Sequence, residues 1–170
     1  MLPLITKFSP ILPQHYEILR SHMMCLNGDD RYQRFGSAIS NDAIDKWIKT
    51  LSWDEFQLFG AWRLDYFARP VELIGVLQLA PMNTFGSYEL AMTVLQAYRR
   101  RGIATAMVST AIKIESLQRI KKIICQNGHP VMRSIVRTLE LDAHYQNVPP
   151  KMHILCERPK QNKLHMVAYD

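Results

Sequence analysis

The segment of this sequence best suited to binding an anion is a short arginine-rich loop followed by small residues. Three arginines, Arg99 to Arg101, precede Gly102, and Ala104 follows after one more position. The loop comes directly after a strand-like run and opens a segment with helical periodicity. The first amides of a helix have no internal acceptors, and the helix dipole adds about half a positive charge there. The pattern therefore predicts a phosphate site.

The small residues of this loop suit a pyrophosphate in particular. Gly102 and Ala104 carry little or no side chain, so a pyrophosphate can approach the backbone closely. Other phosphate loops do not fit, because the sequence contains neither GxxxxGK[ST] nor GxGxxG. A nucleoside triphosphatase and a Rossmann dinucleotide site are therefore not supported.

The elements that must position this loop form an alternating α/β pattern. Apolar spacing predicts helices over 13–26, from about 40, over 104–112 and over 130–139, and strands over 56–62, 72–79, 87–94, 122–125 and 151–157. The first three strands follow one another closely, so we expect an antiparallel meander. Strands that then alternate with helices predict a mixed sheet with helices on its faces.

Length and composition agree with one globular domain spanning 1–170. The chain has 170 residues, is 48% hydrophobic and has a net charge of +6, which favours anionic partners. No run approaches the roughly 18 apolar residues of a membrane span, and the start lacks the pattern of a signal peptide. Three scattered cysteines make an odd count without a CxxC, which is typical of a reducing compartment, so we expect a cytoplasmic protein.

The loop and its surroundings resemble one enzyme family. Arg99-x-x-Gly102-x-Ala104 resembles the [QR]-x-x-G-x-[GA] acetyl-CoA motif of the GNAT N-acetyltransferases. The preceding run 89–94 looks like the fourth strand of that family, and 73–76 looks like its third. The segment 30–35 is similar to one near the start of a bacterial subgroup of the family. The resemblance extends from about Pro3 to Leu141.

The resemblance implies the GNAT fold, in which the mixed central sheet has an antiparallel N-terminal meander, strands 4 and 5 splay apart, and helices cover both faces. It implies an N-acetyltransferase that uses acetyl-CoA as the donor. The amine of the acceptor attacks the thioester directly in a ternary complex. The acceptor is an amine-bearing small molecule or a protein, and the sequence leaves this choice open.

The resemblance also assigns residues to the cofactor. The end of the fourth strand supplies backbone contacts to pantetheine, the loop and helix start surround the pyrophosphate, and an asparagine after the fifth strand touches the cofactor. The residues in these places are Val94, Leu95, Arg99, Arg100, Arg101, Gly102, Ile103, Ala104, Thr105 and Asn127.

The same resemblance gives Glu89 as the catalytic residue. An amine with a pKa of about 10.4 is mostly protonated at neutral pH, so a base must accept its proton. Glu89 stands where the family often carries that base, and it could equally orient the substrate or pair with an arginine. A backbone amide near Leu95 would stabilise the oxyanion. The helix over 132–139 lacks the tyrosine that often protonates the thiolate; neither Ser134 nor Tyr145 matches the motif, so the acid stays unassigned.

The sequence leaves several alternatives open. A GNAT-like domain that senses acyl-CoA without efficient turnover is the second hypothesis, and nucleic-acid binding through the basic surface is a third that we do not expect. The six histidines lack ligand spacing, so no metal is expected. The tryptophans are expected in the core, and Arg31 and Arg34 either bind an acidic substrate or brace the fold. Homodimers are common in the family, but no residue pattern here tests this.

Overall fold

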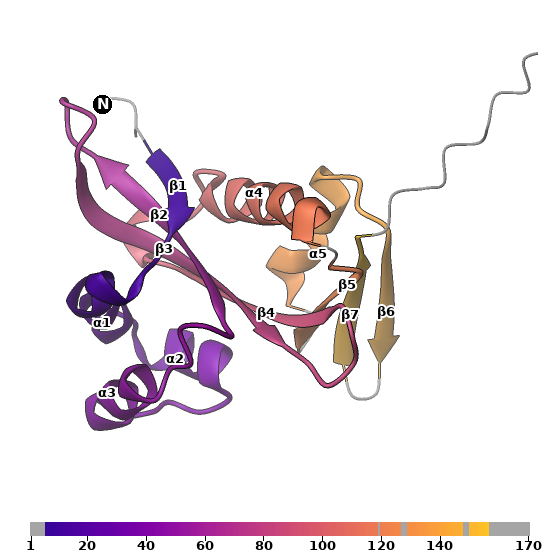
Figure 1. Ribbon diagram of the computed structural model, residues 1–170, viewed down its shortest axis with the longest axis horizontal. Helices are drawn as coiled ribbons and strands as arrows, with labels where there is room; N and C mark the ends of the chain where they lie inside the picture. Colours follow the sequence, from indigo (N-terminus) through magenta and orange to yellow (C-terminus); the bar gives the residue numbers. More distant parts are fainter. Residues whose placement is uncertain (1–5, 119, 127–128, 148–149, 157–170) are drawn as a thin grey trace, which may run out of the picture.

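A computed structural model describes residues 6–118, 120–126, 129–147 and 150–156 of the chain (Figure 1). Its strands are β1 Thr6–Pro10, β2 Gln57–Leu64, β3 Pro70–Pro81, β4 Ser87–Val94, β5 Lys122–Gln126, β6 Ala143–Asn147 and β7 Pro150–Leu155. Its helices are α1 Tyr16–Met24, α2 Gly28–Phe35, α3 Asn41–Lys49, α4 Ile103–Gln118 and α5 Pro130–Thr138, with short 3₁₀ turns at Pro13–His15 and Gln96–Tyr98.

The strands form one mixed sheet in the order β1-β2-β3-β4-β5-β7-β6. Strands β4 and β5 run parallel, and the other neighbours run antiparallel. Helices α1, α2 and α3 gather on one side of the sheet, and α4 and α5 lie on the other (Figure 1). The mixed sheet, its antiparallel meander and helices on both faces confirm the predicted GNAT fold class.

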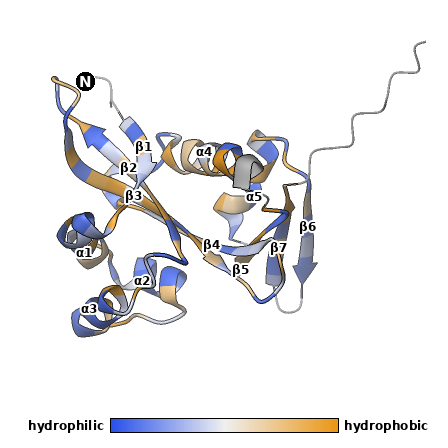
Figure 2. Ribbon diagram, viewed as in Figure 1, coloured by the Kyte–Doolittle hydropathy of each residue, from blue (hydrophilic) through white to orange (hydrophobic). Residues whose placement is uncertain are grey.

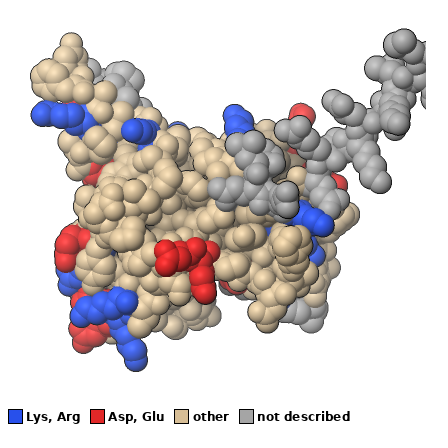
Figure 3. Space-filling view, in the orientation of Figure 1, with Lys and Arg blue, Asp and Glu red and all other residues tan. Residues whose placement is uncertain are grey.

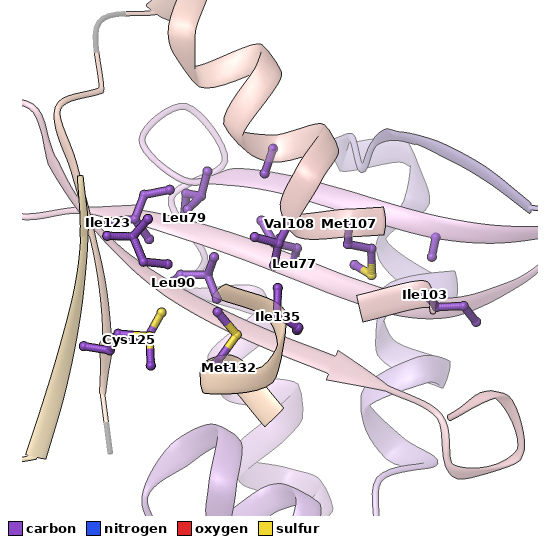
Figure 4. Packing of buried hydrophobic residues seen from close by; sticks show 14 of the residues in the cluster. Leu77, Leu79, Leu90, Ile103, Met107, Val108, Ile123, Cys125, Met132 and Ile135 are labelled. Carbon is purple, nitrogen blue, oxygen red and sulfur yellow. The ribbon is translucent and has the colours of Figure 1, made fainter. Parts of the chain in front are cut away.

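The face under α4 and α5 carries the larger apolar cluster. Met107 and Val108 of α4 pack over Leu77 and its neighbours on the sheet (Figure 4). A β-carbon at Gly75 would lie 2.9 Å from the Met107 sulfur, which is closer than side chains normally approach. Gly75 therefore allows α4 to pack closely against β3.

The opposite face is covered by α1 and α3. Leu19 and Met23 of α1 and Ile44 and Ile48 of α3 are all fully buried. Figure 2 shows both hydrophobic and hydrophilic residues on these helices, while the central strands are mostly hydrophobic. Each helix therefore turns an apolar face to the sheet and a hydrophilic face to solvent.

Arg31 joins the three helices on this face. Its guanidinium and Nε donate to the carbonyls of Leu26, Ile39 and Met24 and to the Asn41 side chain, at 2.8–3.1 Å. The three carbonyls lie at the end of α1, in the loop between α1 and α2, and in the loop before α3. Arg31 therefore braces the fold, which answers for this residue the question that the sequence left open.

The structure adds elements that apolar patterning did not predict. Strands β1 and β6 form the two edges of the sheet, and α2 lies between the two predicted N-terminal helices. The predicted strands and helices are otherwise present, with ends that differ by a few residues. Within the described part of the chain, no helix combines the length and the apolar character needed to cross a bilayer.

Candidate active site

The site lies where β4 and β5 separate. The two strands pair only from Ser87 to Glu89, opposite Lys122 to Ile124, and β4 then continues along β3 to Val94. Strands 4 and 5 therefore splay, as the family resemblance implies. A cavity of about 750 Å³ occupies this opening, and it is lined by β4, the 98–105 loop and helix start, β5, α5 and α2.

The backbone of β4 directs alternate amides into this opening. The Leu95 amide donates to the Ile74 carbonyl of β3 at 2.9 Å. In an antiparallel ladder, bonded pairs alternate with pairs whose polar groups point away from the partner strand. With the observed register, the N–H groups of Met92 and Val94 therefore point away from β3 and toward the gap that β5 has left.

Because of this alternation, the amides of Val94 and Leu95, the two residues predicted to contact pantetheine, point in opposite directions. Val94 lines the cavity and turns its amide to the gap, as a contact to pantetheine requires. The Leu95 amide is engaged with β3, and the Leu95 side chain packs with the core on the α1 side of the sheet. The oxyanion donor expected near Leu95 therefore cannot be the Leu95 amide itself, and the adjacent Val94 amide is the nearest one that faces the gap.

The loop after β4 makes a tight left-handed turn before α4. Arg100 and Gly102 have φ angles of 61° and 76°, in the region that favours glycine. A β-carbon at Gly102 would meet no atom within 4 Å, so the space beside it is open. Gly102 also lines the cavity. Glycine thus adopts this conformation without strain and leaves room for a ligand against the backbone.

Helix α4 opens toward the cavity with unsatisfied amides. Its first internal bond joins the Ala106 amide to the Gly102 carbonyl at 2.9 Å. The amides of Ile103, Ala104 and Thr105 precede any acceptor within the helix, and all three residues line the cavity. Together with the helix dipole, they suit a pyrophosphate. Of the residues predicted for the phosphate site, all except Arg101 line this cavity.

The three arginines of the loop have different surroundings. Arg99 donates through Nε to the Val94 carbonyl at 2.9 Å, and its Nη2 lies 2.6 Å from the Asp30 carboxylate. Arg100 lines the cavity. The Arg101 guanidinium lies over the Tyr98 ring at 5.9 Å, and Arg101 is not among the residues that line the cavity. Arg99 thus holds the loop in place, and Arg100 is the arginine best placed to meet an anion.

A buried histidine on α1 contacts the end of β4 on the face of the sheet that α1 covers. His22 of α1 contacts the Leu73 carbonyl through Nδ1 and the Thr93 hydroxyl through Nε2, both at 2.8 Å. A carbonyl only accepts, so Nδ1 carries the proton and Nε2 accepts from Thr93. Burial lowers the pKa of His22 to about 4, so the ring is neutral at pH 7. Thr93 lines the cavity, and His22 fixes its orientation.

A second polar network holds Tyr98 at the start of the loop. The Tyr98 hydroxyl donates to the Glu72 carboxylate at 2.6 Å, and Arg63 donates to the same oxygen at 2.9 Å. The hydrogen bond to Glu72 and partial burial raise the pKa of Tyr98. Tyr98 therefore stays protonated and serves to anchor the loop to β3.

Glu89 and Arg34 bring opposite charges to the cavity. Glu89 lies on β4 at the last residue pair with β5, and Arg34 lies on the last turn of α2. Arg34 donates to the side chain of Gln78, and burial lowers its pKa to about 10 while the Glu89 charge opposes this. Sequence reasoning named Arg34 without choosing its role, and α2 now places it beside the candidate base.

The remaining polar groups of the cavity come from β5 and α5. Burial raises the pKa of Cys125 to about 12, so its thiol is not ionised at neutral pH. Ser134 of α5 lines the cavity, and so does His129, which sequence reasoning missed. His129 is also the N-cap of α5, a position that could have identified it. Tyr145 lies on β6 with its ring 4.0 Å from the Arg133 guanidinium, outside the lining.

Other predicted residues lie elsewhere. Asn127 falls outside the described residues. Trp62 is buried, and Trp47 and Trp53 pack against the same cluster under α1 and α3, as predicted for core residues. Among the described residues, no group of three or more histidine, cysteine or acidic side chains is arranged to hold a metal ion. On the face in Figure 3, lysines and arginines lie in separate groups rather than in one continuous basic patch.

The sequence matches one family model, described as "Acetyltransferase (GNAT) family", over residues 29–135, more than half of the chain. No curated protein matches it in sequence.

Solved structures share the fold. The GNAT domain of S. lividans PAT is similar with a TM-score of 0.65 and 14% identity, covering 88% of each chain. The ribosomal-protein-alanine N-acetyltransferase of Brucella melitensis has a TM-score of 0.62 and 14% identity, covering 88% of this chain and 99% of its own. PaiA N-acetyltransferase from Thermoplasma acidophilum, in complex with coenzyme A, has a TM-score of 0.58 and 14% identity, covering 89% and 99%.

Proposed function

This chain belongs to the GNAT acetyltransferase family, and on that premise we propose that it transfers an acetyl group from acetyl-CoA to an amine. Family membership supports acetyl transfer in general. The observation that carries the proposal for this chain is the opening between β4 and β5. One cavity there joins the amides at the start of α4 to the Glu89 carboxylate.

The donor side of the cavity fits the charged and polar parts of CoA. The amides of Ile103 to Thr105 are arranged to receive a pyrophosphate, Gly102 leaves space against the backbone, and Arg100 adds positive charge. The β4 amides of Met92 and Val94 point into the gap, where they can bond the amide groups of pantetheine as a neighbouring strand would. Acetyl-CoA supplies a thioester whose carbonyl is open to attack by a neutral amine.

On the acceptor side, we assign Glu89 as the group that accepts the amine proton, directly or through water. The amine nitrogen forms a bond to the carbonyl carbon, and the bond from that carbon to sulfur breaks. We assign the Val94 amide, which faces the gap, as the donor that stabilises the negative charge developing on the carbonyl oxygen. No covalent intermediate with the protein is needed, and the high pKa of Cys125 argues against a thiolate nucleophile.

The departing sulfur needs little assistance. A thiol with a pKa of about 8.5 is a reasonable leaving group as its thiolate. Ser134 is the hydroxyl of α5 that lines the cavity, and it can donate a hydrogen bond to that sulfur. The cysteine pattern supports a reducing compartment, so we place the reaction in the cytoplasm.

The test is a thiol-release assay with acetyl-CoA and a panel of amines that includes α-amino acids, their amides, a polyamine and lysine-containing peptides. Release that depends on both the protein and one amine class, with the acetylated amine identified by mass, supports the proposal. Tight CoA binding without transfer to any amine would instead favour the acyl-CoA sensor.

A further inference from the structure

Arg34 and Glu89 face the same cavity from different elements. Arg34 comes from α2 on one side of the sheet, and Glu89 comes from β4 where that strand leaves β5. Both line the cavity, and the charge of Glu89 acts to raise the pKa of Arg34. No ion pair joins the two side chains, both of which are described. The cavity therefore holds two opposite charges that have not neutralised each other by contact.

Arg34 is held in a fixed position. Its guanidinium lies 4.8 Å from the centre of the Phe35 ring and 5.1 Å from that of the Trp47 ring, and those two rings pack edge to face at 5.3 Å. It also donates to the Gln78 side chain. Aromatic stacking covers the flat faces of a guanidinium and leaves its edge available for bidentate bonding. The contacts thus preorganise Arg34 without using most of its donors.

The other arginines of this region are engaged differently. Arg31 bonds three carbonyls and an asparagine side chain, and Arg99 bonds a carbonyl and pairs with Asp30. A guanidinium has five N–H donors, and Gln78 is the acceptor that the described residues give to Arg34. A half-buried cation with donors to spare, on a cavity wall, is suited to bind an anion.

We propose that the acceptor carries a carboxylate close to its amino group, as a free α-amino acid does, and that Arg34 binds this carboxylate while Glu89 receives the amine. This inference rests on the proposed transfer activity. Gln78 pairs with Ala91, which lies on the same face of β4 as Glu89 and two residues away. Alternate residues on a strand are about 7 Å apart, so a short molecule can reach both charges.

The charges of the site disfavour other amines. A polyamine would bring an ammonium group toward Arg34, and like charges repel in a partly buried site. A lysine side chain of a protein carries no carboxylate near its amine, so it would leave Arg34 without its anion. An α-amino acid satisfies both groups at once, with charge-assisted hydrogen bonds of about 2.8 Å on each side.

The first experiment compares each α-amino acid with its own α-carboxamide in the thiol-release assay. The two molecules share an amine and a side chain and differ only in the negative charge. We expect kcat/KM for the preferred amino acid to exceed that of its amide by about 100-fold or more. Equal rates for acid and amide, or preference for a polyamine or lysine peptide, would overturn the inference and leave the proposed transfer intact.

The second experiment uses Arg34→Lys, which keeps a positive charge near Glu89 but removes the bidentate fork. We expect KM for the amino acid to rise about 10- to 100-fold, with little change for the amide and unchanged affinity for CoA. Arg137→Lys on the exposed side of α5 is the matched control, and thermal melting checks folding. If Arg34→Lys raises KM equally for the amino acid and its amide, or for neither, Arg34 has only a structural or electrostatic role.

Measurements of CoA binding distinguish a failure of the proposed acetyl transfer from a failure of the proposed carboxylate recognition. Wild-type protein that is folded and binds neither CoA nor acetyl-CoA would contradict the proposed function and the inference together. Protein that binds CoA but whose CoA complex binds no α-amino acid, measured by calorimetry, would contradict the inference alone.

Discussion

The Nη2 atom of Arg99 lies 2.6 Å from Oδ2 of Asp30 and so links the loop at the start of α4 to helix α2. The loop belongs to the donor side of the cavity, and α2 carries Arg34 on the acceptor side. One ion pair therefore joins the elements that form the two halves of the site. Through its second bond, to the Val94 carbonyl, Arg99 also fixes the end of β4.

Removing this link should loosen the donor site moderately. Asp30→Asn takes away the charge that holds Arg99, and a partly exposed ion pair is worth little, so we expect the Kd for CoA to rise about two- to five-fold. Isothermal calorimetry measures this. Asp29→Asn is the control, because it removes the other carboxylate from the first turn of α2. An equal effect of both changes would indicate a general effect on the helix rather than on Arg99.

Gly102→Glu should abolish CoA binding. The substitution places a carboxylate in the open space beside the α4 amides and forces a side chain into a φ of 76°. We expect a loss of affinity of at least about 100-fold, because like charges meet at the phosphate site. Gly102→Asn separates the two causes, since asparagine tolerates this backbone region and is neutral. Unchanged affinity in the glutamate variant would refute the phosphate site.

Glu89→Gln should reduce turnover more than cofactor binding. Loss of a general base typically costs about 10²- to 10⁴-fold in rate. The deficit should shrink at high pH, where the amine loses its proton without help. Rates measured across pH with saturating acetyl-CoA test this, and Glu55→Gln, outside the cavity, is the matched control. A variant that follows the wild-type profile would show that Glu89 is not the base.

Cys125→Ala should retain most of the transfer activity. Cys125 lines the cavity but has a pKa raised to about 12 by burial, so little thiolate exists at neutral pH. Direct attack in a ternary complex does not need it. Initial rates at varied acetyl-CoA and amine should give intersecting rather than parallel lines. An acetylated Cys125 found by mass spectrometry during turnover, together with an inactive variant, would contradict this.

His22 should make stability depend on pH. Its pKa is lowered from 6.5 to about 4 in the folded protein, so the unfolded chain binds the proton more tightly. Stability is therefore full above about pH 6.5 and falls as pH drops toward 4, by about 3 kcal/mol at most. Urea unfolding at several pH values should show this slope, and His22→Gln should flatten it. His144→Gln on the exposed edge strand should leave the slope as in the wild type.

Most of the central sheet could be predicted from the sequence because its strands and helices carry strong apolar patterns. Strand β4 was predicted with its observed ends, and α4 showed a clear stripe that packs on the sheet. Strands β1 and β6 were missed because they lack such apolar patterns. They are short edge strands, β1 ends in a proline and β6 is largely exposed, so neither alternates between core and solvent.

The residues of the proposed donor site could be named from the sequence because a local motif brings them together, whereas those of the proposed acceptor site could not. Helix α2 has eight residues, none of them buried, so it lacks the periodicity that reveals a helix. Its caps were visible in retrospect, since Asn27 precedes it and Gly36 ends it in a left-handed conformation. That Arg34 and Glu89 line the same cavity depends on tertiary packing between α2 and β4, which residue spacing alone does not specify.

The measurement that tests the central claim most directly is calorimetric titration of the folded wild-type protein with acetyl-CoA and, separately, with CoA. We expect one site per chain with a Kd of about 1 μM or lower for both, since the pyrophosphate and pantetheine contacts are common to them. The absence of binding to either molecule, with folding verified by its thermal transition, would contradict the assignment of the cavity between β4 and β5 as an acetyl-CoA site.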